Sequence, residues 1–129
     1  MINIGVALNW IIYGSSGYTQ RPGGISYYSK CTPTTFKQNE HIKTIVNTQY
    51  VDTADWNPHS STYIEGYSAV NTDGIAVPAH SPRNTPPTHT GWHINHYALK
   101  SREEFEQKMS RGSGDGSSKN INIFQLYKL

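Results

Sequence analysis

The sequence predicts an α/β fold that is rich in strands and loops and has one helix near residues 101–111. Apolar and polar residues alternate from Ile2 to Tyr13 with a period of two, which is typical of a half-buried strand. Only 35% of the residues are hydrophobic and 16% are charged, so turn-forming residues make up much of the chain. The segment Ser101–Glu104 has the S-x-x-E pattern of a capping box, which begins a helix.

Further elements follow from turn residues and local composition. We expect additional strands over 42–51, 67–70, 75–77 and 92–99. Asn71–Gly74 predicts a hairpin turn. The helix should end at Gly112, and the Gly/Ser-rich segment 113–119 is expected to be flexible.

Length and composition limit the possible classes of protein. A chain of 129 residues is a single domain or part of one. A net charge of +2 without lysine or arginine clusters does not favour a nucleic-acid partner. No segment is long enough and apolar enough to predict a membrane span. The single cysteine, Cys31, excludes an internal disulfide framework.

The six histidines raise the question of a metal site. His93 and His96 are three residues apart, which places them on opposite faces of a strand, so we do not expect them to share an ion. One of them could bind a metal with ligands from elsewhere, although a buried histidine bonded to the backbone is the favoured alternative. His80 and His89 lie in a proline-rich loop and are expected to be exposed. His41 is expected at the surface or at a sheet edge.

Gly14, Ser15, Ser16 and Gly17 form a turn directly after the first strand. Glycine has no Cβ, so this backbone could approach a ligand closely. The segment matches neither the Walker A loop nor the dinucleotide fingerprint, and an ordinary turn is the alternative.

Three further residues are candidates for substrate binding. Trp10 could stack on a sugar or a base, or could belong to the core. Lys100 lies at the foot of the predicted helix, where free N–H groups would suit a phosphate. His59 follows Pro58 in a rigid loop and could donate a hydrogen bond. A solvated lysine and a plain loop histidine are the alternatives.

Four segments, taken in order, resemble the family-92-type glycosyltransferases. Each is similar to one family pattern: Asn9–Gly17 to W-x-x-F-G-S-S-G with Tyr13 in place of Phe, His41–Val46 to H-x-K-S-I-V, Asn57–His59 to N-P-H, and Ile94–Gly112 to I-N-H-Y-x-x-K-S-x-E-E-F-x-x-K-x-x-R-G. Order and rough spacing agree from about Asn9 to Asp115.

The resemblance implies the C-terminal, acceptor-side part of a GT-A-like, nucleotide-diphospho-sugar transferase fold. It implies transfer of a sugar from a nucleotide-sugar donor to a carbohydrate acceptor, assisted by a divalent metal, Mn²⁺ above all. His96 would bind that metal, Lys100 would lie near the diphosphate, and the Gly14–Gly17 turn would lie near the donor or the acceptor. The resemblance assigns no role to His59.

The family's nucleotide-binding units and its D-x-D motif would precede residue 1, so we expect no turnover from this chain alone. The implied compartment is the cytoplasm for a bacterial or viral parent and the Golgi lumen for a membrane-anchored eukaryotic one. The alternative is a non-catalytic carbohydrate-binding or interaction module that stacks sugars on tyrosines and on Trp10, Trp56 and Trp92. A histidine-based metal hydrolase ranks below both, because Asp52 and Asp55 are not placed for it.

Overall fold

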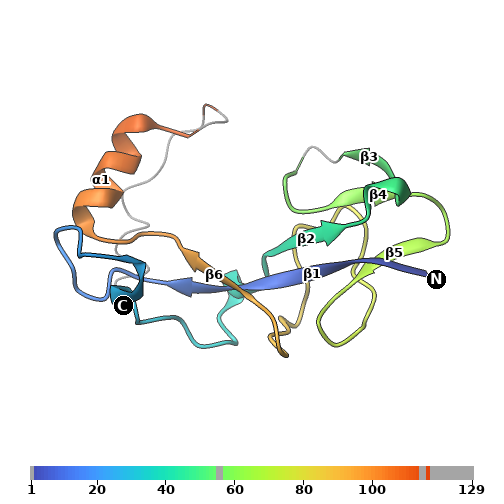
Figure 1. Ribbon diagram of the computed structural model, residues 1–129, viewed down its shortest axis with the longest axis horizontal. Coiled ribbons are helices and arrows are strands. Elements are labelled where there is room, and N and C mark those ends of the chain that lie inside the picture. Colours follow the sequence, from blue (N-terminus) through green and yellow to red (C-terminus); the bar gives the residue numbers. More distant parts are fainter. Residues whose placement is uncertain (1, 55–56, 114–115, 117–129) are drawn as a thin grey trace. The chain divides into compact units, whose positions relative to one another are not determined.

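The structure is a computed structural model that describes residues 2–54, 57–113 and 116. The described chain is mixed α/β and strand-rich, with a helix α1 (Arg102–Arg111) towards its C-terminal end (Figure 1). It divides into two compact units. Unit 1 comprises Met1–Ile11 and Pro33–Ile94, and unit 2 comprises Ile12–Thr32 and Asn95–Leu129.

Six strands are formed by the described residues: β1 (Ile2–Tyr13), β2 (Ile42–Val46), β3 (Val51–Ala54), β4 (Ser61–Tyr63), β5 (Tyr67–Val70) and β6 (Ile94–Tyr97). Short 3₁₀ turns lie at Ile25–Tyr27, Lys37–Glu40 and Thr48–Tyr50. The first strand has the bounds that the alternating pattern predicts.

In unit 1, β1 lies between β2, which runs antiparallel to it, and β5, which runs parallel. Strand β6 also pairs with β1. Gly5 faces Val46 across the β1–β2 ladder. A Cβ on Gly5 would lie 2.5 Å from the carbonyl oxygen of Ile45, so the ladder requires glycine there.

The prediction that β1 is buried on one face only is wrong. Ala7 and Asn9 are fully buried, and Leu8, on the opposite face, is only 7% exposed. Ala7 packs with Ile42 and Val77 in the core of unit 1. Loop residues Asn39, Glu40, Asn84 and Thr88 bond to the Asn9 side chain and so cover that face of β1. A polar residue at this position gives no sign of that burial in the sequence.

The predicted turn at Asn71–Gly74 is confirmed. The Asn71 side-chain oxygen accepts hydrogen bonds from the backbone N–H groups of Asp73 and Ile75, and Gly74 takes a φ of 79°. A single bridge between Val70 and Ala76 stands where a strand over 75–77 was expected.

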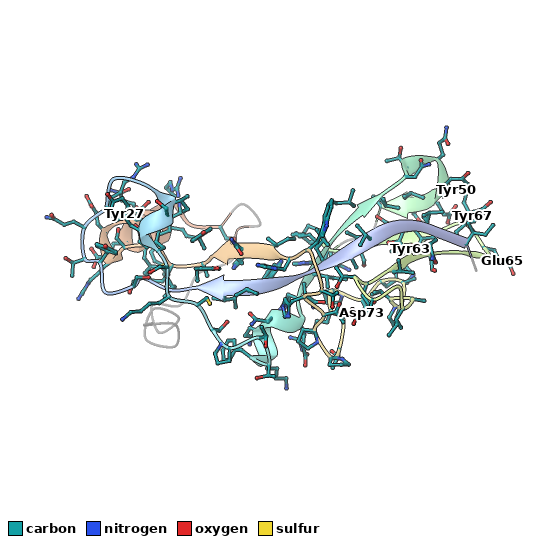
Figure 2. All side chains as sticks on the ribbon, turned by 60° about the horizontal axis from the view of Figure 1, so that its bottom comes forward. Tyr27, Tyr50, Tyr63, Glu65, Tyr67 and Asp73 are labelled. Carbon is teal, nitrogen blue, oxygen red and sulfur yellow. The ribbon has the colours of Figure 1, made fainter. Side chains whose placement is uncertain are left out.

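The predicted strand over 42–51 is interrupted. β2 ends at Val46, and the side chain of Asn47 caps a 3₁₀ turn by accepting a hydrogen bond from the Gln49 N–H. β3 then pairs with β4 as a separate hairpin. Figure 2 shows Tyr50, Tyr63 and Tyr67 gathered at this hairpin, and the Tyr50 and Tyr67 rings are 4.5 Å apart. The Tyr50 ring, which directly precedes β3, therefore packs against Tyr67 of β5.

In unit 2, the predicted capping box is confirmed. The Ser101 side chain accepts a hydrogen bond from the Glu104 N–H, and the Glu104 carboxylate accepts one from the Ser101 N–H. Phe105 anchors the helix, and α1 ends before Gly112, as expected. Strand β6 is shorter than the expected 92–99. Residues 114–115 and 117–119 of the predicted flexible segment, residues 120–129 and Trp56 lie outside the described residues. Among the described residues, no helix has the length and apolar character needed to cross a membrane.

Candidate functional site

Unit 1 brings together three side chains that are far apart in the sequence: Trp10, His41 and His59, here called the Trp10 cluster. The His41 ring stacks on the indole with the centroids 4.9 Å apart and the planes 18° apart. The His59 ring is 5.6 Å from the indole and 5.9 Å from the His41 ring. One face of Trp10 is thus already taken by a histidine, which argues against its use as an open platform for a sugar.

The N-P-H loop holds His59 through a buried asparagine. The Asn57 side-chain oxygen accepts hydrogen bonds from the backbone N–H groups of His59 at 2.9 Å and Ser60 at 3.2 Å. Its amide nitrogen donates to the His80 carbonyl at 3.2 Å. Asparagine closes turns in this way because its side chain mimics the backbone. The Asn-Pro-His pattern therefore has a structural reason, which is to aim the imidazole of His59 at β2.

Both histidines of the cluster are fixed in one tautomer by main-chain carbonyls. The Nδ1 atom of His59 lies 2.7 Å from the Ile42 oxygen, and that of His41 lies 2.9 Å from the Gln38 oxygen. A carbonyl oxygen only accepts hydrogen bonds, so each Nδ1 carries the proton. In the neutral rings, both Nε2 atoms therefore keep a lone pair.

Burial lowers the pKa of His59. The hydrogen bond to Ile42 opposes this shift, and the charges of Lys43 and His41 add to it. Burial penalises the charged form of an imidazole, so the ring is kept neutral at physiological pH.

Behind Trp10 lies a buried amide that the sequence analysis missed. The Asn9 side-chain oxygen accepts from the Asn84 amide at 2.8 Å and from the Thr88 N–H at 3.1 Å. Its amide nitrogen donates to the carbonyls of Asn39 and Glu40, both at 2.9 Å. Asn9 thereby holds the segment that leads into His41. The strand pattern gives no signal for this role, because Asn9 occupies a position expected to be exposed.

His89 is half-buried, so the expectation that it is exposed is wrong. Its Nε2 atom lies 2.9 Å from the Trp10 carbonyl oxygen. This contact fixes the proline-rich loop to β1. His80 is exposed, as expected.

Unit 2 contains a pocket of about 580 Å³ around Lys100, here called the Lys100 pocket. Its lining includes four cationic side chains and one carboxylate: Arg21, Lys100, Lys108, Arg111 and Glu104. Tyr97 supplies an aromatic wall. This surplus of positive charge suits an anionic ligand with more than one charge.

Glu104 organises the mouth of the Lys100 pocket. One of its carboxylate oxygens lies 3.7 Å from the Lys100 ammonium and 3.8 Å from the Arg21 guanidinium. Burial raises the pKa of Glu104, but hydrogen bonds from Tyr28 and Ser101 and the charge of Lys100 outweigh it, so the net pKa is lowered. The carboxylate is therefore charged at neutral pH and holds both cations at the pocket.

The N–H groups at the start of α1 are not free, contrary to the expectation that placed a phosphate there. Arg102 N–H donates to the Tyr18 carbonyl at 3.2 Å, and Glu103 N–H donates to the Thr19 carbonyl at 3.0 Å. The hydroxyl of Ser101 accepts a hydrogen bond from the next N–H, that of Glu104. Anion recognition at Lys100 must rest on side chains.

The Gly14–Gly17 turn has a structural role in unit 2. Gly14 N–H donates to the Lys30 carbonyl, and the Ser16 hydroxyl accepts from the Lys30 N–H, each at 3.0 Å. The buried Ser15 hydroxyl accepts from the Gly17 N–H at 3.3 Å. The turn leads into Tyr18 and Thr19, which cap α1. These contacts account for the turn without a ligand, which was the alternative left open by its pattern.

His96 lies half-buried on β6. Among residues 2–54, 57–113 and 116, no three histidine, cysteine or acidic side chains gather in a way that could hold a metal ion. His96 could therefore supply one ligand, and the described residues do not make a manganese site by themselves.

Replacing Glu104 with glutamine should make the free energy of unfolding depend less on pH in the acid range. A carboxylate whose pKa is lowered on folding stabilises the protein above its unfolded pKa, near 4.5. That contribution is lost as the pH falls through the folded pKa. Urea denaturation between pH 7 and pH 3 should show a smaller loss of stability in Glu104→Gln than in wild type. The exposed Glu106→Gln serves as the control and should follow wild type; equal acid sensitivity of all three proteins would refute the assignment.

Comparison with family models, with curated proteins and with solved structures finds no match for this chain.

Proposed function

We propose that this chain is the acceptor-side part of a family-92-type glycosyltransferase with a GT-A-like fold, which transfers a sugar from a nucleotide-sugar donor to a carbohydrate acceptor. One observation supports the proposal most strongly. Lys100, Lys108 and Arg111 occupy the three basic positions of the K-S-x-E-E-F-x-x-K-x-x-R-G pattern, and all three line one pocket. A helix brings the latter two together because residues three apart share a face.

The chemistry of glycosyl transfer gives these cations a task. Negative charge builds up on the nucleoside diphosphate as its bond to the sugar breaks, and cations placed there beforehand stabilise that charge. The guanidinium of Arg111 or of Arg21 can bind two phosphate oxygens at once, whereas the ammonium of Lys100 acts as a point charge. Lys108 donates to the Ala98 carbonyl at 3.0 Å, which holds its stem along the pocket.

The divalent metal that this family implies remains a prediction. His96 would supply one nitrogen ligand, and carboxylates from outside the described residues would have to complete the site. The cationic pocket binds a diphosphate independently of that ion.

The direct binding test is calorimetric titration of the protein with uridine, guanosine, adenosine and cytidine diphosphates, and with inorganic pyrophosphate. We expect saturable binding of at least one nucleoside diphosphate, tighter than that of pyrophosphate, because Tyr97 adds an aromatic contact. Equal affinity for pyrophosphate would reduce the pocket to a general anion site. Absence of binding at millimolar concentrations would remove the support for the proposal.

Exposed aromatic rings support a second candidate, the non-catalytic carbohydrate-binding module. The Trp92 side chain is 66% exposed, and Tyr27, which Figure 2 labels in unit 2, is 52% exposed. Binding of free glycans without nucleotide or metal, lost in Trp92→Ala, would favour this candidate over the transferase.

A further inference from the structure

His41 and His59 have the geometry of two imidazoles that can share one ion. Zinc–nitrogen bonds of about 2.0–2.1 Å place the ring centres of two imidazoles on one ion roughly 5–6 Å apart, depending on the angle at the metal. The two rings here are 5.9 Å apart, with their planes 51° apart. The separation of the two rings therefore lies within the range that two imidazole ligands of one ion adopt.

The hydrogen bonds of the two rings match those of metal-bound histidines. Metal-ligating histidines almost always donate their second ring N–H to a carboxylate, a carbonyl or water, which fixes the tautomer and the ring orientation. His41 and His59 each place Nδ1 on a main-chain carbonyl oxygen, at 2.9 and 2.7 Å. Nε2 is thereby left as the ligand atom on both rings.

Both rings are also held in place before any ion arrives. His41 stacks on Trp10, and the Asn57 turn fixes the backbone of His59. The charge of Lys43 lowers the pKa of His59, and the Lys43 ammonium donates a hydrogen bond to the Pro58 carbonyl at 2.6 Å. Two imidazoles with a prepared orientation lose little entropy on binding a metal, which favours binding.

We propose that His41 and His59 form a two-imidazole site for a borderline-soft divalent cation such as zinc, nickel or copper. Imidazole prefers these ions, whereas manganese and magnesium prefer oxygen ligands. Two protein ligands leave the other coordination positions of the ion to water or to a small ligand. The site uses residues other than those of the Lys100 pocket, and it stands whether or not the protein transfers sugars.

The test is titration with zinc chloride and nickel chloride, followed by calorimetry, with manganese chloride as the hard-ion comparison. The protein should carry no affinity tag and should contain Cys31→Ser, because the exposed thiol of Cys31 is itself a ligand for soft ions. We expect one ion per chain, and at least about 10-fold weaker binding in His41→Gln and in His59→Gln, since loss even of a supporting contact costs that much. Manganese should bind more weakly than zinc at this site.

His93→Gln is the matched control, because His89 and His93 form a second ring pair 6.0 Å apart. Unchanged zinc affinity in His93→Gln supports the proposal, and loss of binding there overturns it in favour of that second pair. If His59→Gln fails to fold, the wild-type protein still decides: nickel should broaden the ring resonances of His41 and His59 before those of the exposed His80. Absence of binding, or first broadening at His80, would overturn the proposal.

Discussion

Replacing Asn9 with leucine is expected to destabilise the protein by about 3 kcal/mol or more, enough to remove much of the stability of a domain of this size. Asn9 is fully buried in the middle of β1, and its amide bonds to four residues that are distant in the sequence: Asn39, Glu40, Asn84 and Thr88. Leucine has the same branched shape but is larger and cannot hydrogen bond, so the carbonyl, amide and N–H groups that bond to Asn9 would lose this partner. Such groups cost more than the bond itself is worth.

Asn3→Leu is the matched control for this change, since Asn3 is on the same strand but exposed. Guanidinium denaturation, followed by circular dichroism, should give a clearly lower midpoint for Asn9→Leu and a midpoint near wild type for Asn3→Leu. Equal midpoints for the two variants would show that the buried amide network does not hold unit 1 together. Asn9→Leu should also disturb the stacking of His41 on Trp10, because Asn9 holds the backbone just before His41.

The double variant Lys100→Ala/Arg111→Ala is expected to bind a nucleoside diphosphate about 100-fold more weakly than wild type. Each charged contact to a phosphate contributes about 1.5 kcal/mol or more, which is about 10-fold in affinity, and the two contributions should add roughly. Both side chains come from the same pattern and line one pocket, but neither is part of the buried core.

Lys30→Ala is the control for the double variant, because it removes a cation from unit 2 outside the pocket. Calorimetry at fixed ionic strength should show unchanged affinity for Lys30→Ala. A similar loss in Lys30→Ala and in the double variant would mean that overall charge, and not the pocket, attracts the diphosphate.

Local patterns predict the local elements well. The alternation over Ile2–Tyr13 gives the bounds of β1, and the Ser101–Glu104 pattern gives the start of α1, because both depend on neighbours in the sequence. The Asn71–Gly74 turn is found for the same reason. The break after Val46 is missed because one asparagine cap, at Asn47, outweighs a run of β-branched residues.

The sites depend on contacts over long distances in the chain, and the sequence predicts them only in part. Trp10, His41 and His59 are each recognisable from a motif, but nothing in their spacing predicts that the three rings meet. Lys100 is predicted to bind a phosphate together with free N–H groups at the start of α1. The carbonyls of Tyr18 and Thr19 already accept hydrogen bonds from those N–H groups. Burial of Asn9 follows from the loop residues Asn39, Glu40, Asn84 and Thr88 that bond to it, and no local pattern encodes these contacts.

The central claim, that this chain is part of a nucleotide-sugar transferase, is tested most directly by nucleotide-sugar consumption. The polypeptide should be taken at the length at which its source cells make it, supplied with Mn²⁺, and assayed for release of nucleoside diphosphate from a panel of nucleotide sugars. We predict release by that polypeptide, none by residues 1–129 alone, and loss of release in His96→Ala with an unchanged circular dichroism spectrum. Wild-type rates in His96→Ala would remove the metal-ligand assignment, and failure to consume any nucleotide sugar would contradict the transferase itself.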